Sequence, residues 1–333
     1  MSSSTTTPTT IKLSGTDLTS IPHEVYQYAE HLDTLELPNN RLTELPLDLT
    51  TRLTRLARLS LSWNQLPSLP PAVAHLEALR ELRITDNLLT TLPPELGRLC
   101  SLEFLNASYN QYVRLPIRTT LTLTLVRAGR ISHVDELSFA SLSRLRTLIL
   151  SVNQLERLPH SIGNLASLQV LSLASNRLAS LPDSIAALTA LQTLTVTWNR
   201  LQQLPEHVCS LVSLRTLDVY SNQLTQLPCD LSRLSSLTVL SAARNQLHTV
   251  PESLRELTSL RTLLLDYNDF HAIPPCILAM KRANANLATL LMVHNPLSDV
   301  PPEHKLSNQT LQDYLAKCCA ESTCGTGSES STT

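Results

Sequence analysis

Glycine and aromatic residues are both scarce in this sequence. Its 333 residues include 6 glycines and 4% aromatic residues, and no glycine lies in a phosphate-loop or dinucleotide-binding pattern. A nucleotide-binding enzyme is therefore not expected. The formal net charge is -2, so no strong basic field would attract nucleic acid or an anionic membrane surface.

Long hydrophobic runs are missing as well. No apolar stretch approaches the roughly 18 residues that a membrane-spanning helix needs, so we expect no transmembrane segment. Residues 1–10 are rich in Ser and Thr and lack the basic start and apolar stretch of a signal peptide. The seven cysteines are an odd number without paired spacing, which does not indicate a disulfide framework. These features together predict a cytoplasmic protein.

Leucine, in contrast, makes up about a fifth of the chain. The leucines fall in a self-similar unit of 23 residues, for example from Leu168 to Pro182 and again from Leu191 to Pro205. An asparagine occupies the same place in most units, and worn copies at Thr16 and Gly129 raise the expected number of turns to thirteen. The asparagines are Asn40, Asn64, Asn87, Asn110, Asn153, Asn176, Asn199, Asn222, Asn245, Asn268 and Asn295.

Each position of the unit has a physical role. Leucines five and three residues before the asparagine point to the same side of a short strand, into a core. The asparagine amide has donors and acceptors that can bond the backbone where the strand ends. Outer segments such as residues 183–191 have apolar residues three apart, which predicts short helical or 3₁₀ turns. We therefore predict an α/β solenoid, a horseshoe of about 13 turns with a concave parallel sheet and short convex helical segments.

The repeats also predict the domain boundaries. We expect a disordered segment at 1–10, the solenoid at 11–305, a capping helix at 306–320 and a disordered tail at 321–333. The step from Asn110 to Gly129 is irregular, with 19 residues instead of 23. The irregular repeat at 111–135 is either a neutral deletion or a kink that divides the binding face. A 27-residue step before Asn295 predicts an insertion near residues 280–286.

The inner face of the predicted sheet is the candidate binding surface. Its side chains lie six, four, two and one residues before each asparagine and point away from the core. An N-terminal group comprises Arg58, Trp63, Glu81, Arg83, Asp86, Tyr109 and Arg127. A C-terminal group comprises Trp198, Asp218, Tyr220, Arg244, Asp266, Tyr267 and His294. Trp, Tyr and Arg anchor protein interfaces, and the mixed charges suit a protein better than a phosphate backbone. The alternative is that these are ordinary solvated residues.

Catalytic and metal-binding motifs are not found in the sequence. The ten histidines are scattered, and no metalloprotease, paired-cysteine or nucleophile-elbow motif occurs. We therefore expect no enzyme activity, no cofactor and no metal. His207 and Cys209 are two residues apart on an outer segment and are expected to be surface or core filler. Lipidation or metal binding at Cys318, Cys319 and Cys324 is an open alternative to a role in packing or in the tail.

The closing Leu-Pro pairs, the 23-residue period and the lack of disulfide caps resemble the Ras-group intracellular leucine-rich repeats. This family includes plant intracellular Ras-group proteins and the animal Shoc-type scaffold, and the resemblance covers residues 11–301. It implies a signalling scaffold that holds protein partners on the concave face, among them a Ras-type small GTPase or a protein phosphatase. The short phosphatase-docking motif of the form R/K-V/I-x-F/W is missing from this chain.

These observations predict a non-enzymatic, monomeric protein–protein interaction module. Two alternatives remain open at the level of sequence. One is a structural or assembly component that is bound through its convex side or its tails. The other is a regulatory subunit of a small GTPase or phosphatase complex.

Overall fold

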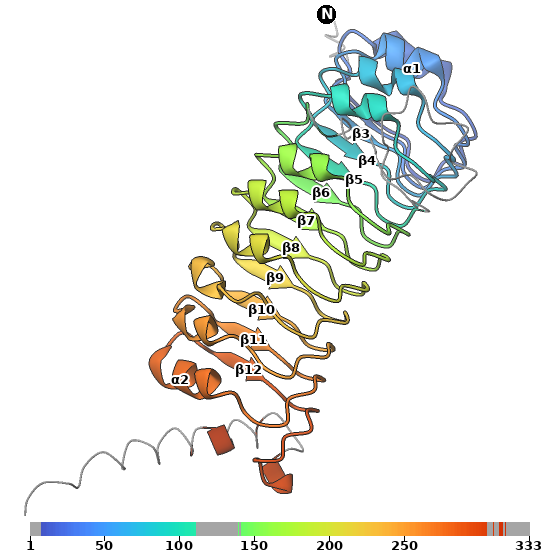
Figure 1. Ribbon diagram of the computed structural model, residues 1–333. Coiled ribbons are helices and arrows are strands. Elements are labelled where there is room, and N and C mark those ends of the chain that lie inside the picture. The colour runs from blue at the N-terminus through green and yellow to red at the C-terminus, as the bar shows by residue number, and fades with distance from the viewer. Residues whose placement is uncertain are drawn as a thin grey trace, which may run out of the picture. The chain divides into compact units, whose positions relative to one another are not determined.

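The computed structural model describes residues 8–110, 139, 141–304, 309, 313–315 and 317. Short strands and short helices alternate along the chain, and Figure 1 shows them repeated turn after turn. The chain forms two compact units, Met1–Leu191 and Gln192–Thr333. Each unit contains parallel strands and outer helices, and the two units are described separately below.

The first unit contains one three-residue strand in each described turn. The strands are β1 (Thr10–Lys12), β2 (Thr34–Glu36), β3 (Arg58–Ser60), β4 (Glu81–Arg83), β5 (Phe104–Asn106), β6 (Thr147–Ile149) and β7 (Val170–Ser172). Each pairs with the next in parallel and in register, so that Leu59 lies opposite Leu82 and Leu82 opposite Leu105. The central residue of nearly every strand is a fully buried leucine. The predicted alternation of inward and outward side chains is therefore confirmed in these turns.

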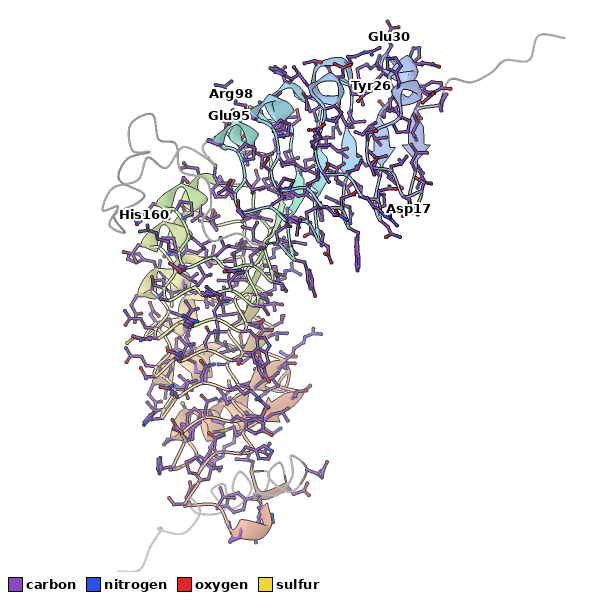
Figure 2. All side chains as sticks on the ribbon, turned by 90° about the vertical axis from the view of Figure 1, so that its right-hand side faces the viewer. Asp17, Tyr26, Glu30, Glu95, Arg98 and His160 are labelled. Atoms are coloured by element: carbon purple, nitrogen blue, oxygen red, sulfur yellow. The ribbon has the colours of Figure 1, made fainter. Side chains whose placement is uncertain are left out.

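Short helices form the outer side of the first unit. They are η1 (His23–Tyr28), α1 (Leu47–Arg52), η2 (Pro71–His75), η3 (Pro94–Arg98), η6 (His160–Asn164) and η7 (Asp183–Ala187). The η segments are 3₁₀ helices, as the three-residue spacing of their apolar residues predicts. Figure 2 shows Tyr26, Glu95, Arg98 and His160 on these outer helices and Asp17 at a loop on another side.

Strands β5 and β6 pair directly, with Phe104 opposite Thr147. The sequence predicts another turn between them, around Gly129, which lies outside the described residues together with the irregular repeat at 111–135 and the candidate Arg127. The amide of Asn153 donates to the carbonyl of Ala107 at 3.1 Å, so the turns that carry β5 and β6 stack on each other. The described part of the chain has twelve strands, and the remaining copy of the thirteen expected falls outside it. The copy at Gly129 has no asparagine with which to make such a link.

The second unit repeats the same arrangement. Its strands are β8 (Thr193–Thr195), β9 (Thr216–Asp218), β10 (Val239–Ser241), β11 (Thr262–Leu264) and β12 (Thr289–Leu291), all parallel and paired in sequence order. Its outer segments are η8 (Glu206–Ser210), η9 (Leu231–Arg233), η10 (Glu252–Glu256), α2 (Pro275–Ala283) and η11 (Pro302–His304). The nine-residue helix α2 overlaps the insertion predicted near residues 280–286 and accounts for the long step before Asn295.

A column of buried asparagines links successive turns within each unit. These side chains are between 4% and 9% exposed. In Asn176, Nδ2 donates to the carbonyls of Leu150 (3.0 Å) and Leu173 (2.9 Å), and Oδ1 accepts the N–H of Leu155 (3.0 Å). One amide therefore satisfies backbone groups of its own turn and of the preceding turn, as the sequence predicts. We call this column the asparagine ladder.

The C-terminal end is described only in part. Residues 309, 313–315 and 317 are helical, Leu315 is fully buried, and the hydroxyl of Tyr314 donates to the carbonyl of Asp299 at 3.0 Å. The remainder of the capping helix expected at 306–320, the tail at 321–333 and the first seven residues lie outside the described residues. Every helix in the described part is too short or too polar to cross a membrane.

Candidate functional site

The residue before each ladder asparagine has a left-handed backbone. Its φ lies between 53° and 60° before each of the eleven ladder asparagines, and none of these residues is glycine. A side chain costs about 1–2 kcal/mol in this conformation because Cβ approaches the following carbonyl. Large side chains nevertheless occupy it: Trp63, Tyr109, Trp198 and Tyr267 are 62%, 57%, 53% and 45% exposed. Because these side chains are largely exposed, their burial does not offset the cost of the left-handed backbone. The stability of the fold therefore does not explain why large residues occupy these positions.

Replacement of Trp63 by glycine is expected to leave the free energy of unfolding unchanged or to raise it by up to about 1.5 kcal/mol. Glycine removes a left-handed cost of about 1–2 kcal/mol but adds about 0.5–1 kcal/mol of chain entropy. Urea unfolding of the parent and of Trp63→Gly would measure this. Ser221→Gly, at a φ of 56°, is the matched control for the backbone effect. A loss above about 1 kcal/mol in Trp63→Gly would show that the indole stabilises the fold.

Five side chains form a continuous stacked row in the second unit. The row comprises Trp198, Tyr220, Arg244, Tyr267 and His294, one from each of five consecutive turns. The rings of Trp198 and Tyr220 meet edge to face with centroids 5.6 Å apart. The Arg244 guanidinium lies 6.0 Å from the Tyr220 ring and 4.8 Å from the Tyr267 ring. Tyr267 and His294 are stacked at 4.1 Å. The structure thus brings together five of the seven C-terminal candidates.

The two aspartates of the C-terminal group bond to the backbone. Oδ1 of Asp218 accepts the N–H of Tyr220 at 3.1 Å, and Oδ1 of Asp266 accepts the N–H of Val293 at 2.9 Å. Asp266 is 9% exposed, and burial raises the pKa of its carboxyl. Both carboxylates therefore hold the turns that carry Tyr220 and His294. Asp266 is a poor position at which to test binding, because a change there would also disturb the fold.

The N-terminal candidates form a looser, more charged surface in the first unit. Arg83 pairs with Glu81 on β4, and its guanidinium lies 4.7 Å from the ring of Phe104 on the next strand. Trp63, Asp86 and Tyr109 follow β3, β4 and β5 in the left-handed position. Phe104 was not among the sequence candidates, although it lies six residues before Asn110 and so belongs to the inner face.

Metal-binding and nucleophilic side chains are dispersed over the described residues. No group of three or more His, Cys, Asp or Glu side chains in this part of the chain could hold a metal ion. Cys209 is 2% exposed, and burial raises the pKa of its thiol to about 11, which suppresses the reactive thiolate. Cys318, Cys319 and Cys324, the candidates for lipidation or metal binding, lie outside the described residues.

The described cysteines are expected to differ in reactivity. Cys100 and Cys229 are exposed, whereas Cys209 and Cys276 are buried with raised thiol pKa values. Treatment of the folded protein with iodoacetamide at pH 8 should modify the exposed pair at least about tenfold faster, because the thiolate is the nucleophile. Peptide mass spectrometry after timed quenching would give the rates. Equal rates for Cys209 and Cys229 would contradict the burial of Cys209.

Parallel strands, a buried asparagine in each turn and short outer helices define a solenoid repeat protein with an open sheet face. A family model described as leucine rich repeat matches residues 9–66, 119–178, 168–224, 189–247 and 212–270. These matches cover more than half of the sequence. The chain belongs to the leucine-rich repeat family.

Two solved structures with the same fold are a bacterial protein and a plant receptor kinase. A leucine-rich repeat protein of Leptospira interrogans is 26% identical with a TM-score of 0.61, over 87% of this chain and 85% of that chain. The Arabidopsis receptor kinase HAESA, solved with the peptide hormone IDA and the co-receptor SERK1, is 26% identical with a TM-score of 0.67. That similarity covers 88% of this chain and 47% of the receptor chain.

One curated relative is a much longer protein than this chain. The adenylate cyclase of Schizosaccharomyces pombe is 29% identical to this chain over 161 residues, which are 46% of this chain. The match spans 10% of the cyclase. The similarity therefore concerns a small part of that protein.

Proposed function

We propose that this chain is a non-enzymatic scaffold that binds a protein partner through the stacked row of its second unit. The supporting observation is the position of the row's side chains. They are large, aromatic or cationic and mostly exposed, and they lie at or beside left-handed backbone positions, which cost conformational free energy. The left-handed backbone recurs before every ladder asparagine, so the distinguishing feature of the row is the size and exposure of its side chains. Trp, Tyr and Arg also dominate the binding energy of protein interfaces.

The geometry of the row favours a preorganised contact. Each ring or guanidinium is held by its neighbours, so little side-chain freedom remains to be lost on binding. The strands beneath it present Thr262, Leu264 and Leu291, which are uncharged. A partner segment with apolar side chains and an acidic group facing Arg244 would satisfy both parts of this surface.

The comparisons and the sequence resemblance suggest the kind of partner. HAESA was solved with a bound peptide hormone, which supports a polypeptide ligand for this chain. The resemblance to Ras-group repeats favours a cytoplasmic signalling protein, such as a Ras-type GTPase or a protein phosphatase. On the basis of the Leu-Pro repeats, we propose that the chain acts as a monomeric scaffold in the cytoplasm.

Affinity capture with a matched pair of variants tests this proposal. Trp198→Ser/Tyr267→Ser removes two exposed rings of the row, and Val212→Ser removes an exposed apolar side chain outside the inner face. Proteins captured by the parent from cytosol, identified by mass spectrometry, are expected to be retained by Val212→Ser and lost from the row variant. Circular dichroism and thermal melting of each variant would verify that the fold is intact.

The opposite pattern would contradict the proposal. A partner that survives the loss of both rings but disappears on truncation at residue 305 would place binding in the C-terminal segment. Loss in a Trp63→Ser variant alone would move the site to the first unit.

A further inference from the structure

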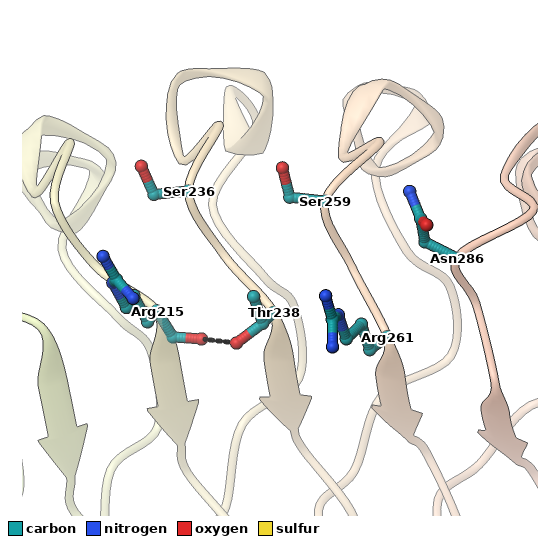
Figure 3. Close-up of a pocket in the computed structure, with 6 residues that line it drawn as sticks. All are labelled: Arg215, Ser236, Thr238, Ser259, Arg261 and Asn286. Carbon is teal, nitrogen blue, oxygen red and sulfur yellow. Dashed lines mark hydrogen bonds between the residues drawn. The ribbon is translucent and has the colours of Figure 1, made fainter.

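A shallow depression opens at the edge of the second unit's sheet, where the strands begin. It has a volume of about 290 Å³ and is lined by six residues in two rows (Figure 3). Arg215, Thr238 and Arg261 directly precede β9, β10 and β11, and Ser236, Ser259 and Asn286 lie on the segments that lead into β10, β11 and β12. These residues lie outside the inner-face positions, so the depression is separate from the stacked row.

The free polar groups of the depression are mainly hydrogen-bond donors. The Thr238 hydroxyl already donates to the Arg215 carbonyl at 2.9 Å, and Nδ2 of Asn286 donates to the Thr258 carbonyl at 3.1 Å. The guanidinium groups of Arg215 and Arg261 make no hydrogen bond or ion pair with any residue that the structure describes. Guanidinium groups carry donors only and stay charged at all physiological pH values. No carboxylate lines the depression, so its positive charge is uncompensated.

A second depression, in the first unit, provides an internal comparison. It has about 320 Å³ and is lined by Ala29, Glu30, His31, Arg52, Thr54 and Arg55. Here Glu30 contributes a carboxylate, and Arg52 pairs with Asp48 at 4.0 Å and lies 5.1 Å from the Tyr26 ring. A depression of similar size is thus charge-compensated in the first unit and uncompensated in the second.

We propose that the depression before β9, β10 and β11 binds a phosphomonoester dianion. The two arginines stand two strand spacings apart, about 10 Å, so that one group between them can be reached from both sides. A phosphomonoester carries up to two negative charges and three acceptor oxygens, which match two guanidinium groups and the neighbouring hydroxyls. A single carboxylate would neutralise one of the two arginines. This site does not depend on the protein-binding role of the stacked row.

Calorimetry on the full chain tests the site with three probes. They are inorganic phosphate, a short peptide whose only charged side chain is phosphoserine, and the same peptide with serine. We expect the first two to bind and the third not to bind. Arg215→Gln and Arg261→Gln should each weaken binding of the phosphoserine peptide at least about tenfold. Arg200→Gln, at an exposed arginine in the turn after β8, removes the same charge elsewhere and should leave binding unchanged.

A further variant distinguishes loss of binding from loss of the fold. Ser236→Glu places a carboxylate in the depression at an exposed position and leaves both arginines intact. It should weaken binding of the phosphoserine peptide by about the same factor as the arginine variants. Tighter binding of the phosphoserine peptide than of inorganic phosphate would identify a phosphorylated protein as the natural ligand. Equal binding of the two probes would identify a small phosphate compound. Three outcomes would overturn the proposal: equal binding of the serine peptide, no binding of either phosphorylated probe, or equal weakening by Arg200→Gln.

Discussion

Asn176→Ala is expected to lower the free energy of unfolding by about 2–3 kcal/mol. The N–H of Leu155 loses its acceptor inside the core, and an unsatisfied buried backbone group costs about 1–3 kcal/mol. The Leu150 carbonyl falls from two donors, Asn153 and Asn176, to one, and the Leu173 carbonyl loses a donor as well. The larger share of the loss therefore comes from the orphaned N–H.

Urea unfolding with an unchanged m-value would measure this loss. Asn164→Ala is the matched control, because Asn164 is an exposed residue at the end of η6 in the same unit. We expect that change to stay within about 0.5 kcal/mol of the parent. An effect of similar size in both variants would show that the asparagine ladder is not a special source of stability.

Arg244→Ala is expected to weaken binding of the partner captured by the row at least about 30-fold, the effect of a central interface residue worth 2 kcal/mol or more. Arg244 lies between Tyr220 and Tyr267, so its removal interrupts the row at the middle. Arg244→Lys should restore little of the affinity, because an ammonium group cannot stack its plane on two rings as a guanidinium does. The stability of the fold should change little, since the residue is exposed and its backbone is left-handed.

Surface plasmon resonance with the purified partner would separate the two rates. We expect the change mainly in the dissociation rate, as is usual for mutants of one interface. Arg200→Ala, the removal of another exposed arginine in this unit, is the control. Full rescue by lysine would indicate that Arg244 acts as a plain charge and not through stacking.

The regular part of the fold was predictable from the sequence because the repeat has a fixed period. The spacing of leucines around Asn176 and Asn199 specifies which side chains face the core, and strands and outer 3₁₀ helices follow from it. The direct pairing of β5 with β6 was not predictable from the sequence. A degenerate copy of the repeat contains no signal that tells whether it stacks in the sheet, and the direct pairing of β5 with β6 depends on long-range contacts.

The candidate surface was predictable by position but not by contact. The sequence places Trp198, Arg244 and Tyr267 in one column before the asparagines, yet only side-chain geometry shows that Tyr220 links Trp198 to Arg244. Asp266 illustrates the opposite case. Its place in the repeat predicts exposure, but the N–H of Val293 in the next turn draws the carboxylate into a buried position. Alternation along a strand carries no information on such bonds between turns.

The asparagine ladder has a mechanical consequence. Because each amide joins only its own turn to the one before, a pulling force applied along the stack meets the links one after another and not all at once. Each released turn would feed about 23 residues of slack, roughly 80 Å of extended chain, before the next link comes under load. Under tension, each unit should therefore behave as a series of small extensible steps, which limits the force that the protein transmits to whatever it holds.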